Sequence, residues 1–228
     1  MRTIHPLALI YKSYTEGILD SKTYKQIIKR VEIVNDAVNR IEYVTTVKFP
    51  DFIIEPSLII GSSDVEFGQH AILYARTIPY PTETNKIKII IQLCAPLILY
   101  GLKGTIHAVM AHEFLHYLNL VKNILEMNIN SDTITVTSFE TSFVDDEKTL
   151  NAKSVYKGDR SLVRMLDSKF ANGLNDTKLD TKTQKMWISK NKSIQSIQLS
   201  KNYTKLPIEA FFNTKFDDHL IAMVQKWN

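Results

Sequence analysis

Hydrophobic positions recur every three or four residues in two long segments, the pattern of an amphipathic helix. The first segment spans 22–42 and follows Ser21, a suitable N-cap. The second runs from Thr105 to about Leu125 and carries apolar residues around much of its circumference, which predicts a central helix. Runs rich in β-branched residues, separated by Gly, Ser, Pro and Thr, predict strands at Val44–Phe49, Phe52–Ile60 with an interruption at Pro56, Ala71–Ile78 and Lys86–Leu93.

The second half of the chain has weaker patterns. Ser131–Phe143 reads as a strand or loop, Leu162–Phe170 as a short helix, and Pro207–Trp227 as a closing amphipathic helix, whereas 171–205 favours no one element. We therefore expect an α+β fold in which a mixed sheet packs on the central helix. Residues 1–129 would form a helix and sheet lobe, and 130–228 a smaller, mainly helical lobe of the same unit.

Composition places the chain among ordinary globular proteins. Of its 228 residues, 44% are hydrophobic and 23% charged, which excludes a disordered chain. Cys94 is the single cysteine, so no intramolecular disulfide can form, and its apolar surroundings predict a core residue. The most apolar stretch, Ile89–Leu102, is too short to span a membrane, and the start of the chain lacks the features of a signal peptide. These features predict a cytoplasmic protein without a membrane partner.

Charge is divided unevenly along the chain. Residues 1–150 carry 14 Lys and Arg against 17 Asp and Glu, whereas 151–228 carry 14 against 7. The basic residues of 151–205 are spread among polar residues, without an Arg cluster or a nucleic-acid-binding motif. We therefore interpret this segment as a solvated surface and expect no nucleic-acid partner.

The central helix contains the pattern H-E-x-x-H at His112, Glu113 and His116. Residues four apart lie one turn above each other on a helix face, so the two imidazoles can bind one Zn²⁺. The glutamate beside the first histidine then points toward the water on that metal. A mostly apolar helix would otherwise have to bury two histidines and a carboxylate, which is costly unless they are paired or bind a metal. His107 lies off this face, and we expect it to be structural.

This motif, together with the order helix, strands, motif helix over about 20–125, resembles the zincin metallopeptidases. The resemblance implies that His112 and His116 bind zinc and that Glu113 activates the zinc-bound water as general base. Metzincins continue with Gly and His at positions where this chain has Asn119 and Lys122, so that subclass is excluded. The resemblance is therefore to gluzincins, which take a glutamate from a later helix as third ligand.

Three glutamates are candidates for that third ligand. Glu209 follows Pro207, which suits a first helical turn, and lies on the apolar stripe of the predicted last helix. Asn213 stands four residues on, where gluzincins often have Asp. Glu140 is the alternative because it lies 24 residues after His116, nearer the spacing of compact gluzincins, whereas Glu147 lies in an acidic run typical of a solvated surface.

We therefore expect a zinc-dependent metallopeptidase that hydrolyses peptide bonds in peptide or protein substrates. Tyr203 is a candidate donor to the oxyanion, and the strand at Ala71–Ile78 or at Lys86–Leu93 could pair with an extended substrate. The alternative is a non-catalytic metal-binding or interaction domain that contacts nucleic acid through 151–205. Glu113 separates the two hypotheses, because a structural zinc site has four protein ligands and needs no base.

Overall fold

The computed structural model describes residues 5–62, 70–126, 150–170, 173–192, 194, 196–199 and 208–227. Its helices are α1 (Ala8–Thr15), α2 (Ser21–Thr45), α3 (Ala95–Tyr100), α4 (Lys103–Glu126), α6 (Ala152–Val155), α7 (Arg160–Lys169), α8 (Thr177–Lys182), the π-helix η1 (Thr183–Ile188), α9 (Ile208–Asn213) and α10 (Asp218–Lys226). Its strands are β1 (Phe52–Glu55), β2 (Ile59–Ser62), β3 (His70–Leu73), β4 (Ala75–Pro81), β5 (Ile87–Cys94) and β6 (Ile197–Leu199). The predicted α+β class with a mixed sheet is confirmed.

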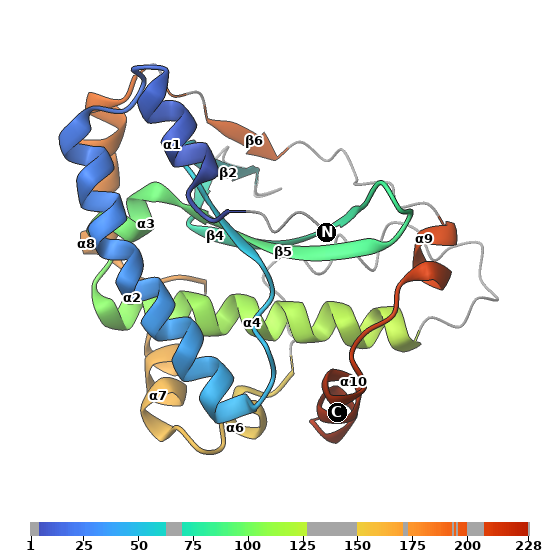
Figure 1. Cartoon of the computed structure of the whole chain (residues 1–228). Coiled ribbons are helices and arrows are strands. Elements are labelled where there is room, and N and C mark those ends of the chain that lie inside the picture. The colour runs from blue at the N-terminus through green and yellow to red at the C-terminus, as the bar shows by residue number, and fades with distance from the viewer. Residues whose placement is uncertain are drawn as a thin grey trace.

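The two long helices form where the hydrophobic pattern predicts them. α2 is capped by Asp20 instead of Ser21, since the Asp20 carboxylate accepts a hydrogen bond from the Thr23 amide at 2.8 Å. α4 is buried on nearly all sides, so the prediction of a central helix is confirmed. Figure 1 shows α4 running beneath the strands, with α6 and α7 on its other side and α2 crossing it.

The strands of the described residues form two small, separate sheets. The first has the order β1-β5-β4, with β1 parallel and β4 antiparallel to β5. The second has the order β3-β2-β6, so a strand from the second half of the chain pairs with one from the first. The predicted strand at Ala71–Ile78 divides at Tyr74, because β3 and β4 belong to different sheets. Among the described strands, β4 thus lies at the edge of the first sheet, and it packs on α4.

Two further predictions are wrong, one of a strand and one of a single closing helix. The strand expected at Val44–Phe49 does not form, because α2 continues through Thr45 and ends at Thr46 in the left-handed region with φ 59°. The single helix expected over Pro207–Trp227 is two helices within the described residues. The second of these starts afresh at Asp217, whose carboxylate accepts hydrogen bonds from the amides of His219 and Leu220.

Elements from both halves of the chain share one hydrophobic core. α7 and α10 pack on α4, and core side chains come from segments as far apart as Ile10 and Val224. None of the helices in the described part of the chain is long and apolar enough to cross a membrane. The predicted strand or loop at Ser131–Phe143 lies outside the described residues.

Candidate metal and catalytic site

α4 brings the two histidines of the motif together. The Nε2 atoms of His112 and His116 lie 3.0 Å apart, and the two ring planes are inclined by 82°. Two ligands at about 2.0–2.1 Å from a tetrahedral zinc ion would have nitrogen atoms about 3.3 Å apart. The separation is within a few tenths of an ångström of that value, so the pair fits one metal ion that both Nε2 atoms contact.

The electrostatic state of His112 also suits metal binding. Burial, and then the neighbouring His116, lower the pKa of His112 to about 3. A charged imidazolium is unfavourable in this apolar surrounding, so the ring is neutral at pH 7. A neutral imidazole has the lone pair that a metal ligand requires.

Glu113 lies beneath the edge strand β4. Its side chain is 6% exposed, and its Oε2 atom accepts a hydrogen bond from the hydroxyl of Thr77 at 2.8 Å. The same hydroxyl lies 3.0 Å from the Glu113 backbone carbonyl oxygen. The structure therefore holds the carboxylate of the residue next to His112 against β4.

Two aromatic residues between 150 and 170 support the motif. The ring of Phe170 stacks on the imidazole of His112, with centroids 3.9 Å apart and planes inclined by 7°. The Tyr156 hydroxyl donates a hydrogen bond of 2.7 Å to the carbonyl oxygen of Ala111, the residue before His112. The sequence analysis did not identify Thr77, Tyr156 or Phe170. Their roles depend on contacts between residues that are 36 to 58 positions apart in the sequence. No motif or periodicity of a single sequence indicates such contacts.

Among the described residues, no third ligand lies with the histidine pair. Within the described ranges, no three residues of the types His, Cys, Asp and Glu come together as a possible metal site. Glu209 is exposed on α9. Its carboxylate is therefore not buried on an apolar stripe, and burial gives no reason for it to bind a metal ion. Glu140, Glu147 and Tyr203 lie outside the described residues. The third ligand stays a prediction.

Cys94 and His107 have other surroundings. Cys94 is fully buried, its thiol donates to the Leu73 carbonyl oxygen at 3.1 Å, and burial raises its pKa to about 12. The expected core position of Cys94 is confirmed. His107 is also buried, with Nδ1 3.3 Å from a guanidinium nitrogen of Arg40 and Nε2 3.4 Å from a carboxylate oxygen of Asp36.

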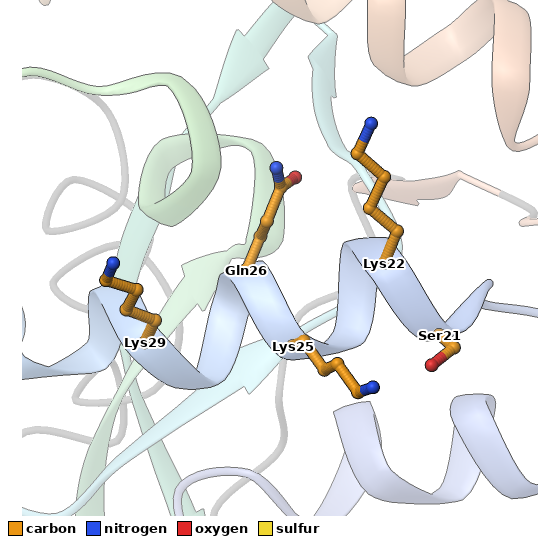
Figure 2. A pocket seen from close by; sticks show the side chains of 5 residues that line it. All are labelled: Ser21, Lys22, Lys25, Gln26 and Lys29. Carbon is orange, nitrogen blue, oxygen red and sulfur yellow. The ribbon is translucent and has the colours of Figure 1, made fainter.

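A separate hollow of about 500 Å³ lies along the first half of α2. Its lining residues are Ser21, Lys22, Lys25, Gln26 and Lys29. Figure 2 shows Lys22, Gln26 and Lys29 extending from one side of α2, whereas Lys25 points the other way. One helix alone lines this hollow and no motif residue reaches it, so it is not part of the candidate site.

Comparison with known proteins gives no relative. No protein family, curated protein or solved structure matches the chain.

Proposed function

We propose that the protein is a zinc-dependent peptidase of the zincin type. His112 and His116 are the ligands, and Glu113 is the general base. The observation that carries the proposal is that the Nε2 atoms of the two histidines lie 3.0 Å apart on α4, where the residue after His112 is a glutamate that is only 6% exposed. A central helix under a mixed sheet with an antiparallel edge strand also supports a zincin-like arrangement.

The residues present suit hydrolysis of an amide. Bound zinc would polarise the scissile carbonyl and lower the pKa of a water to about 7. Glu113 accepts a proton from the attacking water and returns it to the leaving amine nitrogen. Its burial excludes bulk water, which strengthens its interaction with the reacting groups. Phe170 holds the ring of His112 from one face.

The edge of β4 is the proposed docking strand for an extended peptide. The Cys94 amide bonds the Tyr74 carbonyl and the Thr82 amide bonds the Lys86 carbonyl, so even-numbered residues of this strand face β5. The backbone groups of Ala75 and Thr77 therefore point away from β5 and can pair with a substrate. Pro79 and Pro81 have the same orientation but no N–H, so they cannot extend the pairing. We thus favour Ala71–Ile78 over Lys86–Leu93.

Glu113→Gln tests this function most directly. The variant should bind about one zinc ion per chain, like the wild type, and should lose nearly all hydrolysis because an amide cannot accept the proton. Zinc content and cleavage of a library of unstructured peptides are measured for both proteins. Thr45→Val is the control, since it removes a buried hydroxyl whose partners are the Ile41 carbonyl of α2 and the Val47 backbone that follows this helix.

Three results would each contradict part of the proposal. Wild-type protein that takes up no added zinc has no site of this kind. Wild-type protein that binds zinc and cleaves no peptide supports the alternative, a non-catalytic metal-binding domain. Unchanged turnover in Glu113→Gln would assign the base to another residue.

A further inference from the structure

Thr77 is held on β4 so that its side chain reaches the motif helix. It pairs with Ile91 in the sheet and is 3% exposed, and its hydroxyl contacts both the carboxylate and the backbone carbonyl of Glu113. A β-branched side chain has few χ1 rotamers, so the strand backbone fixes the direction of this hydroxyl. The contact thus connects the edge of the sheet to the side chain next to His112.

A carboxylate with 6% exposure needs hydrogen-bond donors, because burial of an unpaired charge is costly. The Thr77 hydroxyl is a donor to Oε2 at 2.8 Å, a normal length for an O–H to carboxylate bond. A glutamate side chain has three rotatable bonds, and this bond restricts the direction in which its carboxylate points. The orientation of the general base is therefore set in part by the sheet.

We propose that Thr77 is a positioning residue that orients the Glu113 carboxylate for proton transfer. The inference rests on the proposed function. Proton transfer requires the base within hydrogen-bond reach of the water, so loss of its orientation affects the chemical step. Substrate binding at the β4 edge uses backbone groups, which a side-chain change at Thr77 leaves in place. The loss should therefore fall on kcat and spare KM.

The test compares three side chains at this position. Thr77→Val keeps the branched shape and removes the donor, so kcat should fall about 10- to 100-fold while KM changes less than about twofold. Thr77→Ser keeps the donor and should stay within about threefold of the wild-type kcat. Zinc content should be equal in all three. Thr45→Val is the matched control, with no expected change in kcat.

A second measurement uses metal-free protein and needs no activity. In a double-mutant cycle followed by chemical denaturation, Thr77→Val should raise the unfolding equilibrium constant about tenfold when Glu113 is present. In the Glu113→Ala background, where the charged partner is gone, the same change should have less than about a threefold effect. If Thr77→Val does not fold, Thr77→Cys replaces it, because a thiol is a weak donor of similar size.

The two proposals fail in different ways. Wild-type kcat in Thr77→Val, or a Thr77→Ser variant as impaired as Thr77→Val, would overturn the positioning role while leaving the peptidase intact. Equal effects of Thr77→Val in both backgrounds of the cycle would also overturn it. A wild-type protein without hydrolysis would overturn the proposed function, and the coupling to Glu113 would still be measured.

Discussion

At the scale of single residues, local spacing predicts only what one helix brings together. His112 and His116 lie four positions apart, so helix geometry places both rings on one face of α4, where their Nε2 atoms lie 3.0 Å apart. Thr77 reaches Glu113 across 36 positions, and Phe170 reaches His112 across 58. Such contacts depend on the register of β4 and on the packing of α7, neither of which a hydrophobic pattern specifies.

The third ligand is tested by substitution of two carboxylates. Loss of a protein ligand should weaken zinc binding about 100-fold or more, whereas neutralising a solvated carboxylate should leave it within about twofold. The exposure of Glu209 leads us to expect the small effect for Glu209→Gln. Glu140→Gln is measured beside it under chelator competition. A loss of 100-fold in Glu209→Gln would assign Glu209 as the ligand.

At the scale of elements, long periodic patterns predict the two long helices correctly, whereas a cap divides the last predicted helix. The periodicity of α2 and α4 extends over many turns and predicts both helices. The apolar stripe after 207 continues across residues 214–217. The Asp217 carboxylate, however, accepts hydrogen bonds from the first amides of α10, so a new helix begins there. Side-chain capping of this kind can end or start a helix within a continuous hydrophobic pattern, and the periodicity does not show where this happens.

Removing the ring that supports His112 should weaken metal binding. Phe170→Leu keeps an apolar side chain and abolishes the stack, so the zinc dissociation constant should rise about three- to tenfold. Phe212→Leu is the control, because Phe212 is 56% exposed on α9. Competition with a chelator measures both. An unchanged dissociation constant in folded Phe170→Leu would show that the stack does not support the ligand.

At the scale of the whole molecule, one ion pair connects the two halves of the chain. Arg40 of α2 binds both carboxylate oxygens of Asp159, at 2.6 and 2.8 Å, across 119 positions. The same carboxylate caps α7, accepting from the amides of Ser161 and Leu162. The hydrogen bond from Arg40, the largest influence, holds the pKa of Asp159 well below its usual range.

Asp159→Asn should lower the free energy of unfolding by about 1–3 kcal/mol at pH 7. Asparagine is also a good N-cap, so the loss of unfolding free energy measures the contribution of the charged pair with Arg40 and not that of the cap. Because the folded-state pKa is depressed, the stabilisation is complete above the unfolded value of about 3.9 and is lost as the pH falls below it. The difference in the free energy of unfolding between Asp159→Asn and the wild type should therefore become smaller below about pH 4. Chemical denaturation of both proteins over a pH series measures this difference.

Asp167→Asn is the matched control for this series, because Asp167 is an exposed carboxylate on the same helix. It should change the free energy of unfolding by less than about 0.5 kcal/mol. If the difference in the free energy of unfolding between Asp159→Asn and the wild type stays constant from pH 7 to pH 3, the ionised carboxylate is not the source of the stabilisation.

Pro79 and Pro81 also affect how copies of the chain behave at high concentration. A sheet edge with a complete row of N–H groups is a template on which a second molecule can add a strand, and repetition of that step produces aggregates. The two prolines remove the donors from the end of β4 beyond Thr77, so an intermolecular ladder cannot continue past that residue. The edge proposed to bind a short peptide is thereby prevented from pairing with the long strand of a neighbouring molecule.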